Sequence, residues 1–96
     1  MAREVLIRGK DINSMDDFYD AVTAAWGMPR PQQFGRNLDA FNDILRGGFG
    51  VNPPFTLIIT HTQHLEECTA VRWSEIVEIL EDEEHDEITV ELRRGG

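Results

Sequence analysis

The sequence has one cysteine, few basic residues and no long apolar run. Because a single cysteine cannot form an internal disulfide, we expect the protein in a reducing compartment, the cytoplasm. The first residues lack the apolar core and the cleavage site of a signal peptide. No apolar stretch approaches the length of a membrane span, so we expect no association with a membrane.

The shortage of basic residues limits the kind of partner that the protein can bind. Lys and Arg number 9 against 18 Asp and Glu, so the formal net charge is -9 over 96 residues. Nucleic acids are bound through basic surfaces, so we expect no direct contact with them and favour a basic protein as partner. The length suits one domain, which we assign to residues 1–96, with 93–96 as a frayed end. We expect this domain to be a monomer when free.

Three short apolar segments predict strands. Residues 4–8 end at a glycine, and residues 55–60 form a near-continuous apolar run that is typical of a strand buried on both faces. Residues 88–92 alternate between apolar and polar side chains, which indicates a half-exposed edge strand. Helical segments separate them in the order β-α-α-β-α-β. Connections of this length favour parallel strands, so we predict an α/β fold with a three-stranded parallel sheet and 55–60 in the middle.

Two helices are predicted between the first two strands. The first begins at Ser14 as N-cap, with Asp17 completing a near capping box, and ends at Gly27. The second runs from a cap at Asn37 to Gly47. Its apolar stripe consists of Leu38, Phe41 and Leu45, with Ile44 at the edge, and its opposite side carries Asp39, Asn42, Asp43 and Arg46.

Asp39 and Asp43 lie one turn apart on the polar side of the second helix. The simpler interpretation is a solvated helix face on which Arg46 is the local ion-pair partner. The functional interpretation is a pair of carboxylates presented to a cationic surface. General acid–base catalysis needs carboxylates in a cleft, which the sequence does not indicate. We therefore expect no enzyme and no cofactor.

The third helix is predicted from an apolar stripe over residues 73–80, and it is strongly acidic. Residues 75–91 hold nine acidic residues and no Lys or Arg, whereas acids and bases balance elsewhere. Several of these acids lie near the C-terminal end of the helix, where its dipole disfavours anions. An arrangement that lowers stability suggests a use, such as attracting a basic partner. A charged face kept for solubility explains the pattern equally well.

Residues 61–70 are predicted to be a loop with at most a short helical turn. Within them, His61, His64 and Cys68 are residue types that bind zinc. The segment has neither a second cysteine pair nor a helical HExxH motif. Loop histidines are the favoured interpretation, and a metal-dependent enzyme that uses these side chains is the less favoured one. We expect no metal.

The residues of the second helix resemble the barstar family, intracellular inhibitors of secreted ribonucleases. The similarity is densest over residues 34–47, FGRNLDAFNDILRG, and with Ile7-Arg8-Gly9 and the element order it covers residues 5–92. The resemblance implies an inhibitor of a guanyl-preferring bacterial ribonuclease, whose active site the second helix and the preceding loop would block. Asp43 matches the family's carboxylate at the phosphate position, and Asp39 matches a second contact. The alternative is an immunity or adaptor module for another basic protein.

Further partner-binding residues follow from the same resemblance. They are Gln33, Gly35, Asn37, Ala40, Asn42 and Gly47 around the second helix, and Asp82 on the third. Glu81 and Glu83 remain alternatives to Asp82 as the acidic contact of the last helix. Gln33 and Asn42 stand where the family has a tyrosine and a tryptophan, so this chain lacks two aromatic contacts that would be expected to anchor an interface.

Overall fold

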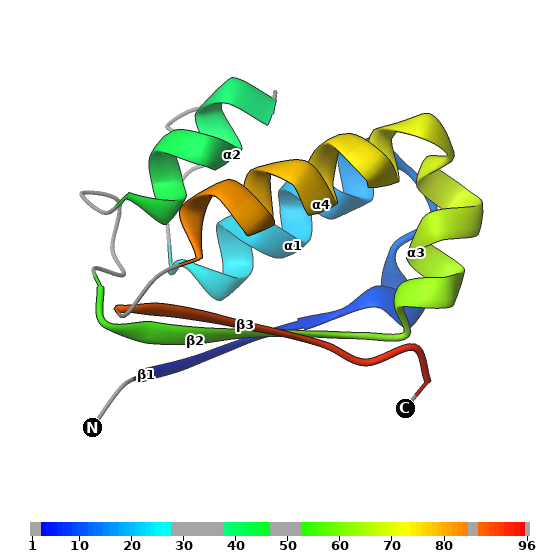
Figure 1. The fold of residues 1–96 in the computed structure, drawn as a ribbon. Coiled ribbons are helices and arrows are strands. Elements are labelled where there is room, and N and C mark those ends of the chain that lie inside the picture. Colours follow the sequence, from blue (N-terminus) through cyan, green and yellow to red (C-terminus); the bar gives the residue numbers. More distant parts are fainter. Residues whose placement is uncertain (1–2, 28–37, 47–52, 85–86, 96) are drawn as a thin grey trace.

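The computed structural model describes residues 3–27, 38–46, 53–84 and 87–95, and Figure 1 shows their arrangement. In chain order the elements are β1 (Arg3–Arg8), the 3-10 turn η1 (Gly9–Asp11), α1 (Met15–Ala25), α2 (Leu38–Leu45), β2 (Phe55–Thr60), α3 (Thr62–Thr69), α4 (Val71–Glu83) and β3 (Ile88–Leu92). Among the described residues, no helix is both long enough and apolar enough to cross a membrane.

The strands form one parallel sheet in the order β1-β2-β3, which confirms the predicted fold class and the central position of β2. The helices lie on one side of this sheet in Figure 1, so among the described residues one face of the sheet is packed and the other is open. Val5 and Ile7 of β1 are buried on the packed face. Five of the six residues of β2 are buried. They include Ile58 on the open face, between Leu6 and Glu91 in the register.

Aromatic side chains connect the helices to the sheet inside the core. The ring of Phe18 in α1 meets that of Phe41 in α2 edge to face, with 5.2 Å between the ring centres. Trp26 packs in the same way on Phe55 of β2, at 5.7 Å. All four side chains are at most 1% exposed. Ile44, expected at the edge of the apolar stripe, is also fully buried, so α2 turns a broad apolar face toward the core.

Local sequence features determine where α1 begins and how the chain turns before it. The Ser14 hydroxyl accepts a hydrogen bond from the Asp17 backbone N–H at 3.2 Å, which confirms Ser14 as N-cap. Before this helix the chain turns sharply at Gly9, against the end of β2. A Cβ atom on Gly9 would lie 2.7 Å from the His61 carbonyl oxygen and closer still to that of Thr60. Only glycine allows this approach without displacing backbone.

Residues 61–70 were expected to form a loop, and that prediction was wrong. Thr62–Thr69 form helix α3. Leu65 is its one large buried apolar side chain, so the segment lacks the apolar periodicity from which a helix is predicted. Buried threonines support it instead, and the Thr69 hydroxyl donates a hydrogen bond to the Leu65 carbonyl at 2.7 Å. Tertiary contacts with η1 and α4 complete the support.

One strained residue joins α3 to α4. Ala70 has φ 52° and ψ -126°, a conformation that is easy only for glycine. We expect Ala70→Gly to raise the free energy of unfolding by about 1 kcal/mol, since the relief of strain exceeds the entropy cost of a glycine. Urea unfolding measures this change. Ala21→Gly inside α1 is the matched control and should lower the same free energy. A loss of stability in Ala70→Gly would contradict the prediction.

Candidate protein-binding surface

Helix α2 presents its two carboxylates to solvent. Asp39 and Asp43 are exposed, whereas Phe41, Ile44 and Leu45 on the other side of the helix are fully buried. Neither carboxylate has a hydrogen-bond or ion-pair partner among the residues that the structure describes. The helix therefore holds two uncompensated negative charges on a rigidly packed support, which suits contact with a cationic group.

Arg46 does not neutralise Asp43, contrary to the prediction that it would be the local partner. Its Nε atom lies 3.3 Å from both carboxylate oxygens of Glu83, at the end of α4. The reason is tertiary: α2 packs beside α4, and Arg46 follows the last residue of α2, so its side chain reaches the neighbouring helix. Nothing in the sequence signals this pair, because the two residues are 37 positions apart.

The pairing of Glu83 distinguishes the acidic residues at the end of α4. The Glu83 side chain is only 13% exposed and is held by Arg46. Glu84 accepts a hydrogen bond from the Val90 backbone N–H at 3.0 Å, which ties it to β3. Glu81 lines a shallow groove between α4 and β3. Asp82 is exposed and has no partner among the described residues. Since helical residues follow one another at 100° steps, Asp82 projects between the Glu81 and Glu83 directions, on the side of α4 opposite the buried Leu80.

A double-mutant cycle tests whether Arg46 and Glu83 couple the two helices. We expect a coupling free energy of about 0.5 kcal/mol, because the Arg46 side chain is 62% exposed and solvent screens the pair. Urea unfolding of Arg46→Ala, Glu83→Ala and the double variant gives this value, and added salt should reduce it. Arg72 and Glu75, an exposed pair within α4, provide the control cycle and should show a smaller coupling. Additive effects of the Arg46 and Glu83 variants would contradict the prediction.

The other predicted partner-binding residues lie partly beyond what the structure describes. Ala40 and Asn42 are half-buried on α2, beside the two exposed carboxylates. The structure thus brings Asp39, Ala40, Asn42 and Asp43 together on one helix, next to the end of α4 that carries Asp82. The remaining predictions, Gln33, Gly35, Asn37 and Gly47, fall outside the described residues.

His61, which precedes α3, and the α3 residues His64 and Cys68 do not form a three-ligand group. The Nε2 atom of His64 lies 3.5 Å from the Cys68 sulfur and 3.0 Å from the Asn13 side-chain oxygen. His61 instead directs its Nδ1 atom to the Thr60 hydroxyl at 3.2 Å. Within the described parts of the chain, no three His, Cys, Asp or Glu side chains are grouped as metal ligands. The hypothesis of a metal-dependent enzyme therefore has no support from this geometry.

Comparison with known protein families identifies one match. The model of the family described as "Barstar (barnase inhibitor)" matches residues 2–93, nearly the whole chain. A search of curated proteins gives no significant match. The family match includes every described element and both carboxylates of α2.

Proposed function

Because the chain belongs to the barstar family, we propose that it inhibits a guanyl-preferring bacterial ribonuclease by covering the active site of that enzyme with α2. Asp43 would occupy the position of a substrate phosphate, and Asp39 would contact the cationic groups around it. Asp82 would add a third carboxylate from α4. The chain itself performs no chemical step in this proposal, since occupation of the site is enough to exclude RNA.

The observation that carries the proposal is that Asp39 and Asp43 are exposed, and without a partner among the described residues, on a firmly packed helix. A ribonuclease must bind phosphates, so its active site presents Arg, Lys or His side chains. Carboxylates without intramolecular partners can form charge-assisted hydrogen bonds there without first breaking others. The rigid support limits the entropy that α2 would lose on binding.

The net charge of -9 adds a contribution to the rate of association. Much of it comes from α4 and the residues that follow, so the field of the protein attracts a basic enzyme before contact. Association should therefore slow as salt is added, whereas dissociation should depend mainly on the contacts of α2.

A second candidate function rests on Asn42. This residue is polar and half-buried beside the two carboxylates, where the resemblance places an aromatic side chain in other family members. Interfaces depend most on buried aromatic and arginine side chains. A surface without that anchor suits a different basic partner, which the protein would bind as an immunity or adaptor module.

An inhibition assay tests the proposal. The purified protein is mixed with several guanyl-preferring bacterial ribonucleases, and RNA cleavage is followed at increasing inhibitor concentration. We expect at least one enzyme to be blocked stoichiometrically, with association that slows in salt. Absence of protection at micromolar excess against all of them would overturn the proposal. Capture of a basic protein without nuclease activity, through Asp43, would support the adaptor function instead.

A further inference from the structure

The first strand of the sheet has a free edge. β1 pairs with β2 on one side, and no strand among the described residues pairs with its other side. Every second residue of such an edge strand directs its N–H and C=O groups away from the sheet, where they can accept another strand. Leu6 in the middle of β1 is 51% exposed, so a large apolar side chain is accessible on this edge strand.

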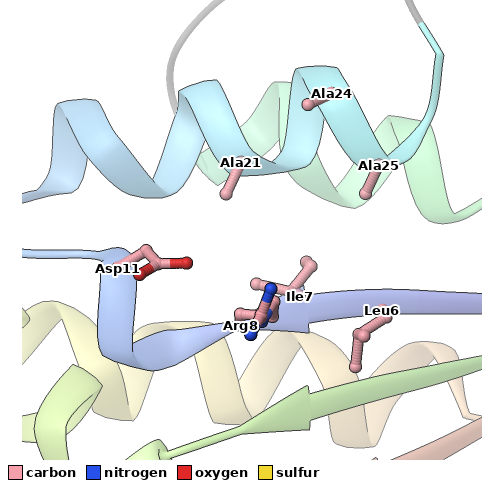
Figure 2. Close-up of a pocket in the computed structure, with 7 residues that line it drawn as sticks. All are labelled: Leu6, Ile7, Arg8, Asp11, Ala21, Ala24 and Ala25. Carbon is pink, nitrogen blue, oxygen red and sulfur yellow. The ribbon is translucent and has the colours of Figure 1, made fainter.

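The edge is accessible because small side chains border it. An open groove of about 320 Å³ lies between β1 and α1, and Figure 2 shows the residues that line it. Leu6, Ile7 and Arg8 line one side of the groove, and Ala21, Ala24 and Ala25 of α1 line the other. Asp11 of η1 also lines it, at one end. Alanine side chains are too short to cover the neighbouring strand, so a second strand can approach β1 along this groove.

The charges on the open face of β1 are arranged symmetrically about Leu6. Glu4 lies two residues before it and Arg8 two residues after it, and all three side chains are exposed. Neither Glu4 nor Arg8 has an ion-pair partner within the described parts of the chain. A strand with an acid at one end, a base at the other and an apolar centre is complementary to itself in antiparallel orientation.

We propose that β1 pairs antiparallel with β1 of a second copy, across a two-fold axis at Leu6, to form a homodimer with a continuous sheet. Glu4 of each copy then lies opposite Arg8 of the other, and the two Leu6 side chains meet at the axis. Val5 lies opposite Ile7 on the packed face. A shift by one residue would place Arg3 opposite Arg8 and would turn exposed side chains toward buried ones.

This dimer is independent of the proposed inhibition. Its surface contains none of Asp39, Asp43 or Asp82, so a dimer would present two copies of the acidic surface. Failure of one proposal therefore leaves the other unchanged. The dimer also differs from the free monomer expected from the sequence.

The molar mass of the full chain tests the proposal. Sedimentation equilibrium from micromolar to millimolar concentration should show a reversible monomer–dimer equilibrium. Hydrogen exchange at the β1 amides should slow as the dimer forms, while amides of β3 at the other edge of the sheet should not change. A monomer throughout this range, or a dimer without protection of β1, would overturn the proposal. Neither measurement requires a variant to fold.

Charge reversal tests the register. Glu4→Arg and Arg8→Glu each place like charges opposite one another twice in the dimer, and each should raise the dimer dissociation constant by roughly tenfold or more. Combining the two reversals restores both opposite-charge pairs and should restore dimerisation. Arg94→Glu, an exposed reversal beyond β3, is the matched control and should have little effect. Failure of the combined variant to recover, when circular dichroism shows it folded, would overturn the pairing of Glu4 with Arg8.

Discussion

Asp43→Ala is expected to raise the Kd for the target ribonuclease by about 30-fold to several thousand-fold, which corresponds to about 2–5 kcal/mol. In the proposed complex this carboxylate is surrounded by cationic groups and shielded from water, so its removal leaves those groups unpaired. The loss should appear mainly as faster dissociation, because the long-range charge of the protein changes by only one unit.

The fold itself should tolerate this substitution. Asp43 is exposed and has no partner among the described residues, alanine favours a helix, and the substitution removes the repulsion from Asp39. Circular dichroism and urea unfolding should therefore match the unsubstituted protein. Glu67→Ala removes the same charge from the exposed side of α3, at the other end of the molecule in Figure 1, and should leave the Kd nearly unchanged. Equal Kd values for the Asp43 and Glu67 variants would contradict the proposed role of Asp43.

Phe41→Ala is expected to lower the free energy of unfolding by about 3–5 kcal/mol. The Phe41 ring is fully buried and contacts Phe18 of α1 edge to face, so its removal leaves a cavity between two helices. Small domains are stable by only about 5–15 kcal/mol, so this loss is a large share of the total. Urea unfolding measures it directly.

The same substitution should also weaken the proposed inhibition, for a different reason. Helix α2 has eight residues, too few to be stable without its packing, and Phe41 is one of three side chains that fix it to the core. The position of Asp39 and Asp43 would then be less well defined. Phe41→Leu fills most of the volume and should cost less than half as much as Phe41→Ala. A Phe41→Ala variant as stable as the unsubstituted protein would contradict this account of the core.

The fold could be predicted from the sequence where one local signal was sufficient. The apolar run at 55–60 indicated a central strand, and the Ser14 hydroxyl gave the start of α1. Helix α3 could not be predicted, because Leu65 is its one large buried apolar residue. The contacts that support the helix come from η1 and α4. Propensity and periodicity carry no information about such tertiary support.

The candidate site, too, could be predicted from the sequence only in part. The spacing of Asp39 and Asp43 was enough to place both on the exposed side of α2, opposite Phe41. The pairing of Arg46 with Glu83 was not predictable, since it depends on how α2 and α4 pack. This pairing also narrows the choice among Glu81, Asp82 and Glu83 as the acidic contact of α4, because Glu83 is already paired with Arg46.

The order of the strands has a consequence for when the combined surface of α2 and α4 forms as the protein folds. Helix α2 belongs to the connection between β1 and β2, whereas α4 belongs to the connection between β2 and β3. The surface that combines their carboxylates therefore exists only after both connections have docked on the completed sheet. A nascent chain that has not yet reached α4 would present α2 without its neighbour, so the proposed protection against a ribonuclease would begin only after α4 has been synthesised and has packed beside α2.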